Sequence, residues 1–117
     1  MTKKEITING KTYPIAFTMD TMINFEEIAD KPFFGNDLKR LKDRMAIIMA
    51  AVITADEKTK LTVEELRGNG DFDAVQQIIA AFNVVMEASI EFFKIPAVEP
   101  KDEKPAGEQN DEEKAKN

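Results

Sequence analysis

The segment from Asp71 to Lys94 constrains the fold more than any other part of this chain. It contains no proline or glycine, and its many alanine, glutamine, glutamate and methionine residues favour a helix. At about 100° per residue, its polar side chains fall on one narrow strip, and nearly every other position is apolar. An ordinary surface helix needs an apolar stripe only a little wider than ~100°. The segment therefore predicts a long helix covered on most sides, either by the rest of a small domain or by another chain.

A second predicted helix, from Asn36 or Asp37 to about Thr54, is amphipathic at first and then uniformly apolar. The stretch Met45–Ile53 is apolar on all sides, which is typical of a fully buried helix. Two such helices in 117 residues predict more apolar surface than one small domain easily covers. We therefore expect self-association or an apolar partner. The alternative is that the N-terminal elements cover this surface by themselves.

The N-terminus carries a strong β-hairpin signal. Polar and apolar residues alternate in Glu5–Ile8 and in Tyr13–Phe17, as in strands with one buried face. Between them, Asn9 and Gly10 form the pair preferred in a two-residue turn, because both positions need a positive φ. Pro14 has no N–H to donate, so its strand is expected to be an edge strand at that point.

Capping signals predict two further helices. Thr18 is suited to cap a helix over 19–29, which the sequence Asp30-Lys31-Pro32 should end. Thr62 and Glu65 have the spacing of a capping box, which predicts a short helix reaching about Arg67. The expected fold is therefore α+β, with an N-terminal β-hairpin followed by a body of three to four helices.

The composition changes after residue 98. Proline, glycine and charged residues dominate residues 99–117, and no large apolar residue follows Val98. Such a segment buries too little apolar surface to offset the entropy lost on ordering. We predict a single domain over residues 1–98 and a disordered acidic tail over 99–117.

The composition also excludes several classes of function. The chain has no cysteine and no histidine, which removes disulfides, thiolate chemistry and catalytic triads that need an imidazole. Its net charge of −6 disfavours binding to nucleic acid and to anionic membranes. The longest apolar run is about half of the ~20 residues that span a bilayer, and no signal peptide is evident. We expect a cytoplasmic protein with no cofactor.

Paired carboxylates are the only material for catalysis. Glu26-Glu27 and Glu64-Glu65 are adjacent in sequence, so on a helix the members of each pair point about 100° apart. They fit solvated helix faces and a cap better than a shared proton site. We therefore predict no catalytic residue and no enzymatic activity.

A calcium loop is the nearest match to a metal site. Asn69, Asp71 and Asp73 have the spacing of its first three ligands. The glycine and the glutamate that such a loop also needs are replaced by Ala74 and Ala80. We interpret the acids as helix N-terminal residues and predict no metal site.

Exposed aromatic and aliphatic residues are the best candidates for partner binding. Phe33 and Phe34 follow the first predicted helix in a loop, where they either fill the core or contact a partner. Val84, Phe92 and Phe93 belong to the large apolar surface of the last helix. We predict that these five residues form the partner-binding surface, and that Val84→Asp weakens binding in a protein that still folds.

The segment Ile6–Met19, ITINGKTYPIAFTM, followed by Phe25-Glu26-Glu27, resembles the start of a known family. The family comprises the small tail assembly chaperones of long non-contractile-tailed phages and prophages. The resemblance implies a hairpin followed by a helical body, no catalytic residues, and a location in the bacterial host cytoplasm. It also implies binding to the tape-measure or tail-tube protein during assembly. Two alternatives from other classes are a small carboxylate-dependent enzyme and an acidic regulatory binding protein.

Overall fold

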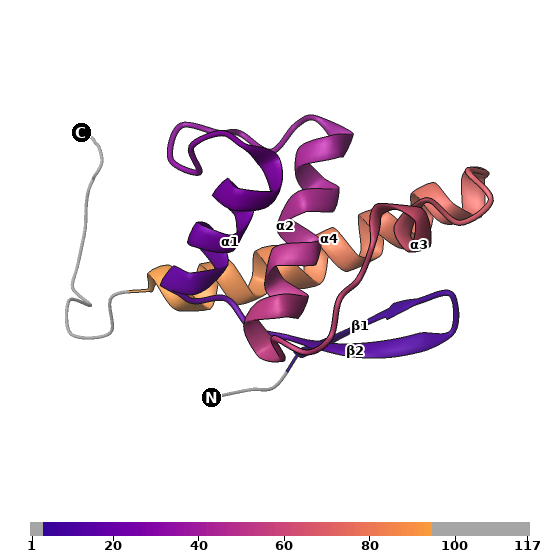
Figure 1. The fold of residues 1–117 in the computed structure, drawn as a ribbon, viewed down its shortest axis with the longest axis horizontal. Coiled ribbons are helices and arrows are strands. Elements are labelled where there is room, and N and C mark those ends of the chain that lie inside the picture. The colour runs from indigo at the N-terminus through magenta and orange to yellow at the C-terminus, as the bar shows by residue number, and fades with distance from the viewer. Residues whose placement is uncertain (1–3, 95–117) are drawn as a thin grey trace, which may run out of the picture.

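The computed structural model describes residues 4–94 and confirms the α+β fold, an antiparallel hairpin followed by helices (Figure 1). The predicted acidic tail, 99–117, and the boundary of the predicted domain at residue 98 lie outside the described residues. In chain order, the elements are β1 (Lys4–Ile8), β2 (Lys11–Ile15), α1 (Met19–Ala29), α2 (Leu41–Ala55), α3 (Val63–Arg67) and α4 (Phe72–Phe93).

The hairpin has the predicted two-residue turn. Asn9 has a φ of 53° and Gly10 a φ of 79°, as this turn requires. Ile8 pairs with Lys11 next to the turn, and hydrogen-bonded pairs alternate with non-bonded pairs from there. Pro14 therefore occupies a non-bonded position, and its missing N–H costs the ladder nothing. One face of the hairpin is buried, through Ile6, Ile8, Tyr13 and Ile15.

Helix α1 begins and ends as predicted. The hydroxyl of Thr18 accepts from the backbone N–H of Asp20, and the side chain of Thr21 completes a capping box. Asp30 ends the helix with a φ of 58°. The hydroxyl of the buried Thr21 also hydrogen-bonds the hydroxyl of Thr54, which links α1 to α2.

Helix α2 begins at Leu41, several residues after the predicted start, so that prediction was wrong. Asn36 and Asp37 stabilise local turns and not the helix N-terminus. The side-chain oxygen of Asn36 accepts from the N–H of Leu38, and the carboxylate of Asp37 accepts from the N–H of Lys39. Leu38 has a φ of 55°, which interrupts any helix at that point. The residues before Leu41 therefore form an ordered loop.

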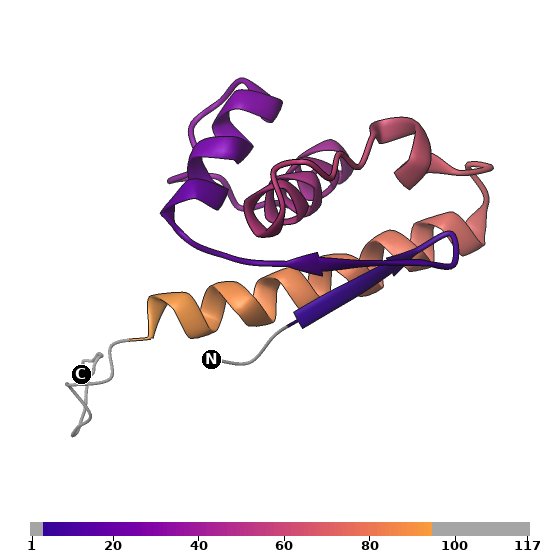
Figure 2. The same cartoon turned by 60° about the horizontal axis from the view of Figure 1, so that its bottom comes forward.

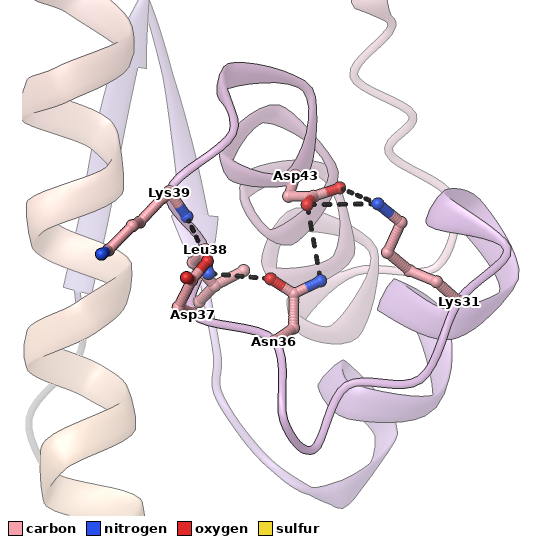
Figure 3. A network of polar contacts seen from close by, with 6 residues as sticks. All are labelled: Lys31, Asn36, Asp37, Leu38, Lys39 and Asp43. Atoms are coloured by element: carbon pink, nitrogen blue, oxygen red, sulfur yellow. Dashed lines mark hydrogen bonds and ion pairs between the residues drawn. The ribbon is translucent and has the colours of Figure 1, made fainter.

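A buried ion pair fixes this loop against α2 (Figure 3). Asp43 is 4% exposed, and its carboxylate lies 3.1 Å from the ammonium of Lys31. The side-chain amide of Asn36 also donates to it, at 3.4 Å. On the next residue, Nε of Arg44 donates to the carbonyl of Leu38 at 2.7 Å. The loop between α1 and α2 is therefore held at both ends by side chains of the first turn of α2.

Helix α2 is the centre of the molecule. It contacts α1, β2 and α4, and every residue of Met45–Val52 is buried. The predicted burial of Met45–Ile53 is therefore confirmed except at its last residue, Ile53, which is half-buried. Helix α3 begins with the predicted capping box of Thr62 and Glu65, and it directs Leu66 into the core. Figure 2 shows α4 along the bottom of the molecule, with α1 and α2 above it and the hairpin alongside.

Helix α4 buries one stripe of its surface. Its N-terminus is capped by Asp71, whose carboxylate accepts from the N–H of Ala74, as predicted. Its buried residues recur at three- and four-residue spacing and face α2 and β1: Ala74, Ile78, Ala81, Phe82 and Val85. None of the helices within residues 4–94 combines the length and the apolar content that a bilayer crossing requires.

Candidate partner-binding surface

Six phenylalanines form an aromatic cluster at the C-terminal end of α4. Phe17, which follows β2, has its ring centroid 6.1 Å from that of Phe33, 5.7 Å from that of Phe92 and 5.9 Å from that of Phe93. Phe33 in turn contacts two more rings at similar distances. The cluster comprises Phe17, Phe25, Phe33, Phe34, Phe92 and Phe93.

The aromatic cluster has a buried side and an exposed side. Phe17 is 6% exposed and Phe25 is completely buried, so these two rings belong to the core. Phe33 is partly buried against them. Phe34 is 73% exposed, and Phe92 and Phe93 are 41% and 48% exposed. The sequence left open whether Phe33 and Phe34 fill the core or contact a partner. In the structure Phe33 packs on the core, and Phe34 projects from it.

Four of the five residues predicted for partner binding thus lie together. The fifth, Val84, is partly buried and packs against the core. Burying an aspartate in an apolar contact costs stability, so Val84→Asp would alter folding as well as binding. That variant is therefore a poor test of the surface. The sequence did not indicate Phe17, the residue that connects the loop to α4, because its partners on α4, Phe92 and Phe93, are more than 70 positions away.

A second apolar surface runs along the outer side of α4. We define the α4 stripe as Phe72, Val75, Ile79, Met86, Ile90 and Phe93. All of these except the partly buried Met86 are exposed, Phe72 by 71% and Ile90 by 69%. The narrow polar strip in the sequence was the signal for this surface, because it left too many apolar positions for one buried face.

Charged residues border the α4 stripe with opposite sign on its two edges. The polar strip of α4 carries Glu87 and Glu91, both within 4 Å of the ammonium of Lys4 on β1. On the α2 side, the guanidinium of Arg44 lies 4.6 Å from the ring centroid of Phe82. In the view of Figure 3, the side chain of Lys39 extends from the loop before α2 toward α4.

Several carboxylates within residues 4–94 accept hydrogen bonds from backbone N–H groups. Glu65 accepts from the N–H and hydroxyl of Thr62, and Glu26 accepts from the N–H of Phe33. Within residues 4–94, no three acidic side chains come together in a metal-binding arrangement. A polar pocket of ≈ 190 Å³ lies between the hairpin tip and the start of α4, where Asp71 already serves as the cap.

Comparisons with known proteins gave no match among family models, curated proteins or solved structures.

Proposed function

We propose that the protein is a non-enzymatic tail assembly chaperone. It binds the tape-measure or tail-tube protein of a phage or prophage in the cytoplasm of the bacterial host and covers apolar surface on that protein before assembly. The observation that carries the proposal is the exposed side of the aromatic cluster. The N-terminal resemblance, ITINGKTYPIAFTM, supplies the identity of the bound protein.

The exposed rings have the properties of a binding surface. Phe92 and Phe93 pack on the buried ring of Phe17, so binding need not first order them. Phe34 packs on the partly buried ring of Phe33. Large aromatic side chains supply much of the binding energy in protein interfaces, because each can bury ~150–250 Å². Three exposed rings on one end of a small domain suit a short apolar segment of an unassembled partner.

The test is co-expression of the full chain with the tape-measure and tail-tube proteins of the phage or prophage that encodes it. Wild type should co-purify with one of them, and Phe34→Ser should reduce the captured amount at least tenfold. Val63→Ser is the control, because Val63 is also an exposed apolar residue, at 47%, but lies on α3, outside both the aromatic cluster and the exposed apolar side of α4.

A wild type that captures neither protein would overturn the proposal. So would a Phe34→Ser, Phe92→Ser double variant that captures as much as wild type. Circular dichroism of each variant shows whether the fold survives, and exposed positions of this kind are expected to change it little.

A further inference from the structure

The α4 stripe has the repeat of a two-helix seam. Phe72, Val75, Ile79, Met86 and Phe93 are separated by three, four, seven and seven residues, and Ile90 lies beside this repeat. The repeat position between Ile79 and Met86 is Phe82, which is buried. An average spacing of 3.5 residues keeps a side-chain row in contact with a second helix along its whole length. The seam spans the 22 residues of α4, or about 33 Å.

The charges beside the seam indicate what kind of helix can cover it. The acidic edge carries Glu87 and Glu91, whose side chains remain 68% and 53% exposed although Lys4 lies near both. The opposite edge carries Arg44 above Phe82. A helix that covers the stripe therefore needs a basic edge on one side and an acidic edge on the other, and α4 with its neighbouring α2 has both.

We propose that the α4 stripe binds the α4 stripe of a second copy of this chain, with the two helices parallel. A two-fold axis along α4 brings the basic edge of each copy to the acidic edge of the other. A two-fold axis perpendicular to α4 would make the helices antiparallel, and would bring acidic edge to acidic edge and basic edge to basic edge. In an antiparallel pair centred on Phe82, Asp73 of one copy would lie level with Glu91 of the other. Opposite charges across an interface favour the first arrangement.

The distances along the helix fit the parallel arrangement. Arg44 lies level with Phe82, and Glu87 is five residues further along α4, or about 7.5 Å. The guanidinium, at the tip of the Arg44 side chain, therefore has to turn away from Phe82 to reach Glu87 of the other copy, and symmetry repeats the contact. Leu41, one turn before Arg44 on α2, is 51% exposed and extends the apolar surface on the same side. A stable interface needs about 800 Å² per partner, so this added surface matters.

Sedimentation equilibrium of the full chain tests the pairing. The wild type should give twice the 13.2 kDa of one chain, and Ile79→Asp should give a single chain. Ala80→Asp is the control: Ala80 is also exposed, but it points about 100° away, onto the polar strip, and its variant should stay dimeric. A wild type that remains a single chain at about 1 mM overturns the proposal, as does a dimeric Ile79→Asp.

A single introduced thiol tests the direction. The chain has no cysteine, so Val75→Cys, which lies in the repeat of the seam, carries one thiol per copy. Parallel helices bring the two thiols together, and mild oxidation should give a covalent dimer. In the antiparallel pair described above, the two positions lie 14 residues apart along the helix, or about 21 Å. A disulfide needs Cα atoms within ~7 Å.

Ala80→Cys should form no covalent dimer under the same oxidation. A dimeric wild type whose Val75→Cys variant stays unlinked overturns the parallel arrangement. A single-chain protein that instead binds vesicles through Ile79 overturns the pairing as a whole. None of these outcomes depends on which protein the aromatic cluster binds, so the pairing and the proposed chaperone function fail separately.

Discussion

Helices α2 and α4 have similar apolar sequences but opposite surroundings. In α2, every residue of Met45–Val52 is buried, because α1, β2 and α4 surround it. In α4, one stripe faces α2 and β1, and a second apolar stripe beside it stays exposed except at the partly buried Met86. An apolar circumference therefore shows that a helix needs cover, but it does not show which chain supplies that cover.

The strongest test of this comparison is the same substitution in both helices. Ile48 of α2 is completely buried, so Ile48→Ala should lower the free energy of unfolding by about 2–5 kcal/mol. Ile79 of α4 is 45% exposed, so Ile79→Ala should cost less than about 1 kcal/mol. Urea unfolding at low protein concentration measures both without a contribution from pairing.

Equal losses of unfolding free energy in Ile48→Ala and Ile79→Ala would contradict the contrast between α2 and α4. They would mean that the outer side of α4 is covered within a single chain in solution. A loss at Ile79 that grows with protein concentration, while that at Ile48 does not, would instead show that a second copy supplies the cover.

Much of the local structure was predictable because its causes are local. The turn at Asn9 and Gly10 needs only residues of positive φ. The caps at Thr18, Thr62 and Asp71 bond to N–H groups two or three residues away. These features follow from neighbouring side chains, so the bounds of α1, α3 and α4 could be read from the sequence.

The loop before α2 and the candidate site could not be read in this way. Asn36 and Asp37 have the chemistry of helix caps, and only the positive φ of Leu38 shows that they cap turns. The partner of Asp43 is Lys31, in another element, so its burial left no local signal. The aromatic cluster likewise depends on contacts between residues as distant as Phe17 and Phe92. The sequence predicted exposed phenylalanines, but not which rings would support them.

The next prediction concerns what keeps the start of α2 covered. The loop that covers it is fixed by the carboxylate of Asp43, which accepts from Lys31 and Asn36. Asp43→Ala should lower the free energy of unfolding by about 2 kcal/mol. The loss is smaller than for a fully buried pair, because the side chain of Lys31 remains 33% exposed and regains water. Chemical denaturation measures the loss.

A double-mutant cycle separates the ion pair from the general effect of each substitution. Lys31→Ala alone leaves the buried carboxylate with only Asn36 as a partner, so it should also destabilise the protein. The double variant should lose less than the sum of the two, by at least about 1 kcal/mol. Additive losses would show that packing, and not the ion pair, fixes the loop on α2.

The smallest expected effect concerns the covered side of α4. Asn9 at the hairpin tip donates from Nδ2 to the carbonyl of Glu65 at 2.8 Å, and its backbone N–H donates to Gln77 at 2.7 Å. Asn9→Gly keeps the turn but loses the side-chain bonds, and should cost about 1 kcal/mol. Asn9→Ala loses the same side-chain bonds, and alanine tolerates a positive φ less well than asparagine or glycine, so this variant should cost more. If the glycine variant unfolds at the same urea concentration as wild type, the tip bonds add nothing, and apolar packing alone holds the hairpin on α4.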